Sequence, residues 1–388
     1  MFGDELLKAN KALVNGDYQK ALKHYFKAEK TAPWDAHIPF GIGNTYFSMG
    51  DYDKALTYLN KAVASDPKYA NAYNLIGNIY FNRKEFDLSV DFYKKALGLD
   101  PSVINYYTNL ANVFFQMEDY PSVINTLGMI VPERVIDDGL YNMIGVSYLY
   151  LGHFEDAISY FRKAVGINPN VGNYYYHLSI ANRNQGNFET ALQYARKYVQ
   201  LEPERSEGYQ ELGAVLLDLE IYDQSIQSYE KAIELAPDNA IYYKQLADVY
   251  TWIDEYDQAI LNYQEAIKLE PQWAECYNLI GDMYYFKEDF EEAKAYYRKT
   301  VEIDPDFAQA YNNLGGAALR DQDYQQAVSF FKKAIEIDPE SDIFFDNLAH
   351  AYAGLQQYDR AIASVKKAIS LNPGDDDYQT HLEELVAH

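Results

Sequence analysis

Proline returns every 34 residues along almost the whole of this chain. The interval is broken once, by a step of 68 residues in which Val135 stands where a proline is expected and Pro132 lies three residues early. Counting back from the prolines divides residues 2–375 into eleven repeats. This self-similarity indicates one long array of small structural repeats rather than two or three ordinary domains. The prolines are Pro33, Pro67, Pro101, Pro169, Pro203, Pro237, Pro271, Pro305, Pro339 and Pro373.

Other positions recur with the same period. A small residue occupies one place in all eleven repeats, and an aromatic residue follows it nine positions later. Three positions after the aromatic residue comes Ala or Ser, except for Val123 in the fourth repeat. The small residues are Ala9, Gly43, Gly77, Ala111, Gly145, Ser179, Gly213, Ala247, Gly281, Gly315 and Ala349.

Each repeat has the pattern of two helices joined by a short turn. Apolar residues recur at helical spacing on both sides of turn sequences such as "NGDY", "MGDY", "LGHF" and "QGNF". The proline that closes the repeat prevents the second helix from continuing. Each helix is expected to have ~13 residues and a length of roughly 20 Å. The small residues are expected where the two helices cross, because a side chain larger than Ala would push the helix axes apart.

This pattern resembles the tetratricopeptide repeat, whose order is aromatic-x2-Leu/Ile-Gly-x2-Tyr, then Ala-x3-aromatic, then Pro. The resemblance covers residues 2–375. It implies an all-α fold, a right-handed superhelical solenoid of helix-turn-helix repeats, whose first helices line a concave groove that holds peptides or protein partners. Two matching copies are Tyr73, Ile76, Gly77, Tyr80, Ser89, Tyr93 and Pro101, and Tyr277, Ile280, Gly281, Tyr284, Ala293, Tyr297 and Pro305.

Two segments depart from the regular repeat. The fourth repeat, residues 104–137, lacks its closing proline, and we expect its second helix to start after Pro121 and to stop near Pro132. Simple drift or a hinge would both account for this irregular joint. Residues 376–388 are expected to form a C-terminal capping helix, whose Leu382 and Leu385 cover the apolar face of the last repeat.

Composition limits the partners and the compartment. The chain has 388 residues and a formal net charge of −25, so it repels nucleic acid and anionic membrane surfaces and attracts basic partners. Its one cysteine, Cys276, allows no internal disulfide, which fits a reducing compartment. The sequence contains no signal-peptide pattern and no apolar run of ~18 residues. We therefore expect a cytoplasmic protein that does not insert into a membrane.

Asparagines recur on the first helices at positions that are expected to face the groove. An Asn side chain carries a donor and an acceptor and can bind a peptide group bidentately. The resemblance supports this interpretation, since some family members carry asparagine ladders that bind extended peptides. The alternative is that these asparagines only hydrogen-bond the neighbouring repeat. The candidate peptide-binding residues are Asn44, Asn78 and Asn112, the nearby Asn74 and Asn109, and Phe47, Phe81 and Phe115 as an apolar floor.

Carboxylates dominate the expected groove positions in the second half of the chain. They form either a solvated face or a track for a basic segment of a partner. The cations among them are mainly Arg183, Lys244 and Arg320. The candidate basic-partner-binding residues are Glu207, Glu211, Asp218, Asp248, Glu275 and Asp282, with Asp346 farther along.

The sequence shows no pattern for catalysis, a cofactor or a metal. None of the seven histidines stands at a zinc-type spacing from another histidine or from the cysteine. We therefore predict a non-catalytic adaptor or scaffold that binds a protein or peptide segment. Two alternatives stay open. One is a scaffold that assembles with itself, suggested by aromatic runs such as Tyr174–Tyr176 and Phe344–Phe345. The other is the substrate-selecting repeat region of a larger enzyme.

Overall fold

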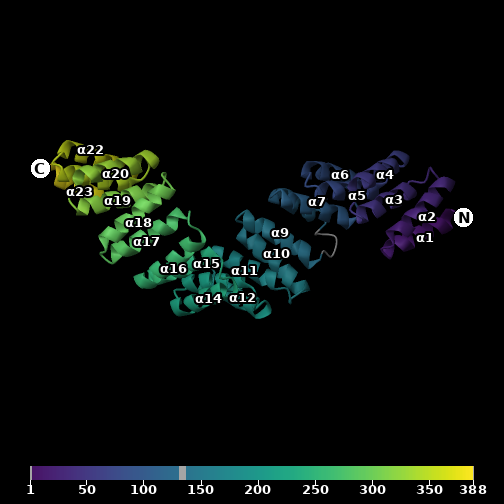
Figure 1. Ribbon diagram of the computed structural model, residues 1–388, viewed down its shortest axis with the longest axis horizontal. Coiled ribbons are helices and arrows are strands. Elements are labelled where there is room, and N and C mark those ends of the chain that lie inside the picture. The colour runs from purple at the N-terminus through teal and green to yellow at the C-terminus, as the bar shows by residue number, and fades with distance from the viewer. Residues whose placement is uncertain (1, 131–136, 388) are drawn as a thin grey trace. The chain divides into compact units, whose positions relative to one another are not determined.

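The computed structural model describes residues 2–130 and 137–387 of the chain, and these form 23 α-helices and no strand. The predicted all-α fold is confirmed. The chain divides into two compact units, Met1–Leu201 and Glu202–His388. Within each unit the helices follow one another as packed pairs, and each helix contacts its neighbours in chain order (Figure 1). None of the helices that the structure describes combines the length and the apolar character that a membrane crossing requires.

The N-terminal unit contains the first six repeats. Odd-numbered helices are the first helix of each repeat, and even-numbered helices are the second. They are α1 (Phe2–Val14), α2 (Tyr18–Thr31), α3 (His37–Ser48), α4 (Tyr52–Ser65), α5 (Ala70–Asn82), α6 (Phe86–Leu99), α7 (Ile104–Gln116), α8 (Tyr120–Gly128), α9 (Asp138–Tyr150), α10 (Phe154–Ile167), α11 (Gly172–Asn184) and α12 (Phe188–Leu201).

The C-terminal unit contains the other five repeats and one further helix. They are α13 (Ser206–Asp218), α14 (Tyr222–Leu235), α15 (Ala240–Trp252), α16 (Tyr256–Leu269), α17 (Ala274–Phe286), α18 (Phe290–Ile303), α19 (Ala308–Arg320), α20 (Tyr324–Ile337), α21 (Asp342–Gly354), α22 (Tyr358–Leu371) and α23 (Asp376–Val386).

The turn inside each repeat contains one residue in the left-handed backbone region, with φ between 58° and 81°. Glycine adopts this conformation without steric cost, and it occupies four of the eleven turns. The other seven turns accept a strain of about 1–2 kcal/mol each, because packing of the two helices fixes the turn. The residues are Gly16, Gly50, Lys84, Glu118, Gly152, Gly186, Glu220, Asp254, Glu288, Gln322 and Gln356.

The small residues of the first helices lie against large side chains of the second helices, as predicted. A Cβ added to Gly77 would lie 2.6 Å from the Tyr93 ring. A Cβ added to Gly281 would lie 2.5 Å from the Tyr297 ring. These separations are shorter than real Cβ contacts, so the ring fills the space that the absent side chain leaves. The two helices of a repeat therefore cross at a contact between a backbone and a ring.

The second helix of the fourth repeat is short. It spans nine residues, whereas the second helices of the other repeats have fourteen. It begins at Tyr120, two residues before the start that the sequence suggests, with Pro121 in its first turn. Val123 and Ile130 are buried where most other repeats have Ala or Ser, so larger side chains fill this core. The expected end of the helix at Pro132 lies outside the described residues.

The terminal helix α23 packs against α22. Tyr378, His381 and Leu385 are buried, and Leu382 is half-buried against the same apolar cluster. The Asp375 side chain accepts a hydrogen bond from the backbone N–H of Asp377 and caps the start of the helix. Within the numbering of the repeats, α23 occupies the place of another first helix.

The contact between Gly77 and Tyr93 can be tested by adding one methyl group. Gly77→Ala should lower the free energy of unfolding by about 1–3 kcal/mol, because the new Cβ overlaps the buried ring. Gly98→Ala on the exposed face of α6 is the matched control, since its Cβ meets no atom within 4 Å. The control should stabilise the protein by up to about 1 kcal/mol through helix propensity. Equal urea-unfolding midpoints for the two variants would contradict the packing argument.

Candidate peptide-binding surface

The eight candidate peptide-binding residues lie on three consecutive first helices, α3, α5 and α7, and all are half-buried. Five of them line one pocket of about 220 Å³. Asn44 lines a neighbouring pocket of about 270 Å³ with Asn10 and Tyr69. Asn74 and Phe115 are not among the residues that line these two pockets. The first pocket is lined by Phe47, Asn78, Phe81, Asn82, Tyr93, Asn109 and Asn112.

A tyrosine on the second helix hydrogen-bonds the recurring polar residue 15 positions earlier. Tyr93 donates to Asn78 Oδ1 at 2.6 Å, and Tyr25 donates to Asn10 Oδ1 at 2.6 Å. The same pair occurs with a carboxylate in the C-terminal unit, where Tyr263 donates to Asp248 at 2.7 Å. In these repeats the oxygen of the Asn or Asp side chain accepts the hydrogen bond that a buried tyrosine hydroxyl must donate within the protein.

Asn44 and Asn112 have no such partner. The residues 15 positions later are Leu59 and Leu127, which are buried and offer no donor. Within the described ranges 2–130 and 137–387, neither side-chain amide makes a hydrogen bond. With respect to the part of the chain that the structure describes, these two asparagines keep both their donor and their acceptor capacity for another molecule.

Neighbouring first helices are joined by a second set of amide bonds. Asn109 Nδ2 donates to Asn74 Oδ1 at 2.9 Å, and the same nitrogen lies 3.4 Å from Asn78 Oδ1. Asn74, Asn78 and Asn109 are thus a hydrogen-bonded triad between α5 and α7. This triad braces adjacent repeats, as the alternative interpretation of the asparagines predicts. Asn44 and Asn112 make no side-chain hydrogen bond within residues 2–130 and 137–387, and their role in peptide binding stays a prediction.

Each of the three phenylalanines packs against an aromatic ring of its own repeat. Each packs against the aromatic residue that begins the second helix of its own repeat. The ring centroids are 5.8 Å apart for Phe47 and Tyr52 and 5.9 Å apart for Phe81 and Phe86. Phe47 and Phe81 also line the 220 Å³ pocket, where they provide an apolar wall. Phe115 packs on Tyr120 in the same manner.

The C-terminal unit contains a second pocket, most of whose residues are at repeat positions equivalent to those of the 220 Å³ pocket. It has about 330 Å³, and six of its lining residues stand 204 positions, or six repeats, after residues that line the first pocket. Asp282 replaces Asn78, and Phe286 replaces Asn82. The second pocket therefore has the same frame with a carboxylate and more exposed aromatic surface. It is lined by Asp282, Tyr285, Phe286, Tyr297, Asn312, Asn313, Gly316 and Asn347.

Asp282 is the strongly perturbed acid of this second pocket. One carboxylate oxygen accepts hydrogen bonds from Tyr297 at 2.8 Å and Asn313 at 3.0 Å, and the other accepts from Asn278 at 3.0 Å. Burial raises the pKa of Asp282 to about 6, although the bond from Tyr297 opposes this. The same burial and the Asp282 carboxylate raise the pKa of the Tyr297 phenol.

The other candidate acids differ in their surroundings. Lys244 Nζ lies 3.2 Å from Asp248 and 3.3 Å from Glu275 and neutralises part of this group. Glu211 is buried. Glu207 lies 3.8 Å from Arg205, and Asp218 is exposed. The structure thus places these carboxylates in local networks rather than in one uniform row.

The sequence did not single out Tyr93 or Tyr297 as site residues. The signal was present, because a tyrosine follows each of Asn78, Asp248 and Asp282 by 15 positions. Cys276 is fully buried in α17, and burial raises the pKa of its thiol to about 12. Such a thiol is a poor nucleophile.

Family models described as tetratricopeptide repeat or TPR repeat match seven stretches of the chain. These are residues 43–84, 70–103, 142–206, 206–239, 253–305, 278–342 and 318–385. A search among curated proteins found no significant match.

The solved structures that this chain resembles share little sequence with it. The C-terminal part of a TPR repeat-containing protein from Cytophaga hutchinsonii has a TM-score of 0.51 at 19% identity, over 61% of this chain and 98% of the other. Yeast Tom70 has a TM-score of 0.49 at 18% identity, over 100% of this chain and 95% of the Tom70 chain. The structure of Naa15/Naa10 bound to HypK-THB has a TM-score of 0.45 at 16% identity, over 99% of this chain, which spans 65% of that one.

The half-buried carboxyl of Asp282 should make stability depend on pH. Between its ordinary pKa of 3.8 and its folded pKa of about 6, the folded protein keeps a proton that the unfolded chain releases. The free energy of unfolding should therefore fall as pH rises through this window. Asp282→Asn keeps an acceptor for the Tyr297 hydroxyl, as Asn78 provides one for Tyr93. Because the amide does not titrate, the variant should not lose stability in this pH window.

The variant should gain stability relative to the wild type by on the order of 1–3 kcal/mol between about pH 4 and about pH 7. Urea unfolding across this range measures the difference. Glu230→Gln, an exposed change on α14, is the control and should show no such trend. A difference between Asp282→Asn and wild type that stays constant with pH would contradict the assignment.

Proposed function

This chain belongs to the tetratricopeptide repeat family, and we propose that it is a non-catalytic adaptor that holds an extended peptide or protein segment on its first helices. The observation that carries the proposal is the pocket between α3, α5 and α7. It combines amide groups at regular spacing with phenylalanine walls. Asn112 in this pocket and Asn44 in the neighbouring pocket have no internal partner among the described residues.

Backbone recognition fits this chemistry. An extended peptide presents unpaired N–H and C=O groups, and each Asn side chain offers one acceptor and one NH₂ donor. The Asn74–Asn78–Asn109 triad is rigid because its members are bonded to one another and to Tyr93. Asn44 and Asn112 lie one repeat to either side of Asn78 and would grip the peptide backbone. Phe47 and Phe81 would receive apolar side chains of the partner.

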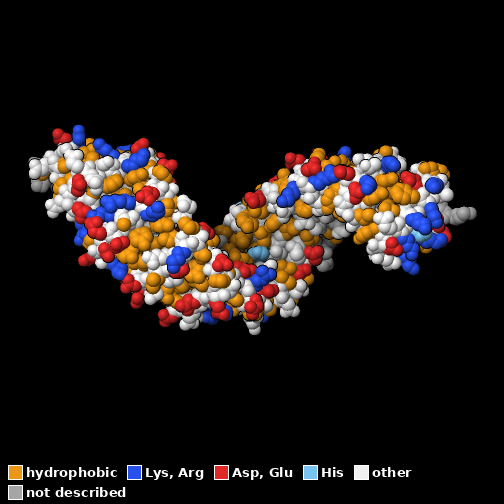
Figure 2. All heavy atoms as spheres, in the orientation of Figure 1, with side chains coloured by type: hydrophobic (Ala, Val, Ile, Leu, Met, Phe, Trp, Pro, Cys, Tyr) orange, Lys and Arg blue, Asp and Glu red, His pale blue; other side chains and the backbone are white. Residues whose placement is uncertain are grey.

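The C-terminal unit suits a partner of different composition. Its equivalent pocket offers the Asp282 carboxylate beside Tyr285 and Phe286, whose exposed fractions are 40% and 56%. A lysine or arginine of the partner would contact the carboxylate and an aromatic face together. Both groups attract a cation. Acidic and basic side chains are interspersed on the face shown in Figure 2. With the net charge of −25, this surface favours a basic protein segment over nucleic acid.

Self-assembly receives less support from the residues that suggested it. Tyr174, Tyr175 and Phe344 are buried within the chain, and Tyr176 and Phe345 pack against apolar clusters. They are therefore used by the fold itself. That the chain selects substrates for a larger enzyme remains an alternative form of the same binding function.

The peptide proposal can be tested with a random peptide library selected on the full wild-type chain. Fluorescence anisotropy then gives the affinity of the selected peptides for each variant. Asn44→Ala/Asn112→Ala should weaken binding by about 2 kcal/mol, roughly thirtyfold, because at least two amide hydrogen bonds are lost. Methylation of the contacted peptide nitrogens should have a similar effect, since the recognition is of backbone groups.

Asn60→Ala is the matched control, because Asn60 is exposed on the second helix α4. It should leave the affinity unchanged, and circular dichroism should confirm that all variants are folded. Selected peptides that bind the double variant as tightly as the wild type, or a library that yields no binder, would disprove the proposed use of Asn44 and Asn112.

A basic peptide held by the C-terminal unit should show a strong salt dependence. Its affinity should fall severalfold when ionic strength rises from about 0.05 M to about 0.3 M, because exposed charge pairs are screened. Asp218→Asn/Glu275→Gln should reduce both the affinity and its salt dependence. Binding of that peptide that is insensitive to salt would remove the role proposed for these carboxylates.

A further inference from the structure

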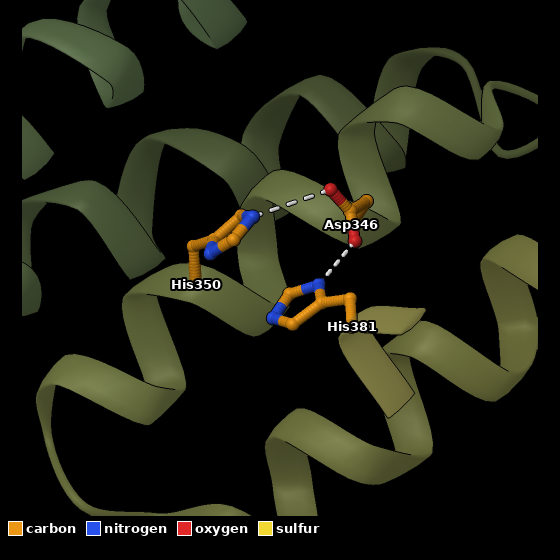
Figure 3. A group of neighbouring side chains, drawn as sticks. All are labelled: Asp346, His350 and His381. Carbon is orange, nitrogen blue, oxygen red and sulfur yellow. Dashed lines mark hydrogen bonds and ion pairs between the residues drawn. The ribbon is translucent and has the colours of Figure 1, made fainter. Parts of the chain in front are cut away.

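Two histidines that are 31 residues apart in sequence meet at the end of the C-terminal unit. His350 and Asp346 lie one turn apart on α21, and His381 comes from the terminal helix α23 (Figure 3). Asp346 Oδ1 lies 2.6 Å from His381 Nδ1, and Asp346 Oδ2 lies 3.4 Å from His350 Nε2. The two imidazole rings are stacked, with centroids 3.9 Å apart and an angle of 16° between their planes.

This cluster occupies repeat positions that hold amides elsewhere. Asp346, His350 and His381 stand 272 residues, or eight repeats, after the Asn74–Asn78–Asn109 triad. A third triad at equivalent positions is Asn278, Asp282 and Asn313, which is joined by the same pattern of hydrogen bonds. A polar brace at this place therefore requires only amides and a carboxylate. The last triad differs, because both amides that face each other are replaced by imidazoles.

The two imidazoles and the carboxylate that stand in place of the amides have the chemistry of a transition-metal site. Imidazole nitrogens and a carboxylate oxygen are the ligands that zinc takes in sites with three protein ligands, and neutral amides are poor substitutes. One ligand atom from each residue can be chosen so that all three lie within 4.8 Å of one another. A tetrahedral ion with bonds of ~2.1 Å holds its ligands roughly 3.4 Å apart, so binding requires a modest contraction.

The surroundings permit that contraction and leave one side open. The His381 and Asp346 side chains are 10% and 18% exposed, so packing fixes their positions. The His350 side chain is 53% exposed and can rotate toward the other two. Three protein ligands would leave a fourth tetrahedral position for water or for a partner's side chain.

We propose that Asp346, His350 and His381 bind one divalent transition-metal ion, with Zn²⁺ as the best match to two nitrogens and one carboxylate oxygen. The ion replaces the proton-mediated contacts between the two imidazoles and the carboxylate. It fastens α23 to α21, and it stabilises the end of the C-terminal unit by mass action, because the unfolded chain does not bring the three ligands together.

The triads provide matched variants for a test. The full chain is stripped of metal with a chelator and titrated with Zn²⁺ alone by isothermal titration calorimetry. The wild type should bind one ion per chain and gain thermal stability on binding. Asp346→Asn/His350→Asn/His381→Asn rebuilds the amide brace of α5 and α7, so it should stay folded and lose the site. His350→Asn alone, at an exposed position, should weaken binding at least tenfold.

Two further variants separate this site from unspecific binding. His153→Asn removes a half-exposed histidine whose nearest carboxylate is Asp156, at 3.9 Å, and it should not change the titration. Asn74→Asp/Asn78→His/Asn109→His copies the cluster into the N-terminal unit and should add a second ion. The visible absorption of bound Co²⁺ should indicate tetrahedral coordination by nitrogen and oxygen.

The proposal is overturned if the wild type shows no saturable binding of one ion. It is also overturned if His350→Asn binds with less than a tenfold loss of affinity, or if the triple Asn variant binds as the wild type does. Because His350 is exposed, its single variant remains a valid test if the triple variant does not fold.

Discussion

The structure depends on one steric contact that is repeated along the chain. In six of the repeats a glycine on the first helix lies against a large side chain on the second, as Gly77 does against Tyr93. This contact fixes the distance and the crossing of the two helices, and it repeats because the fold propagates by stacking equal pairs. It also explains why the turn tolerates Lys84 or Glu118 in a left-handed conformation, since the helix pair determines the turn.

A constant frame gives each repeat position a constant set of neighbours. Asn78 and Asp282 each follow the small residue of their repeat, and each bonds a tyrosine 15 places later and an asparagine 31 places later on the next first helix. The chemistry of the surface is therefore decided by which residues occupy a fixed set of places. Amides there brace α5 against α7, and a carboxylate at Asp282 gives an acid with a raised pKa. Imidazoles at His350 and His381 give, with Asp346, a cluster of metal-ligating atoms.

The sequence predicted the fold well because its signals are local and repeated. The spacing of the prolines, the turn residues and the small residues all act within one repeat, and eleven copies reinforce each other. The site was predicted only in part. The same residue type at the same position, Asn, is bonded to Tyr93 in one repeat, whereas in two others the residue 15 places later is a buried leucine, Leu59 or Leu127. Whether an Asn is available for a ligand depends on its partner across the helix pair, which the asparagine pattern alone does not reveal.

By itself, the sequence determined that this chain forms paired helices of fixed length with a small residue at each crossing, because these features follow from contacts between residues close in sequence. Only the tertiary structure decided which polar groups are used internally and which remain available. It showed that Asn74, Asn78 and Asn109 form a brace, and that His350 and His381 converge on Asp346. These meetings join different repeats, and their geometry is set by how one helix pair stacks on the next.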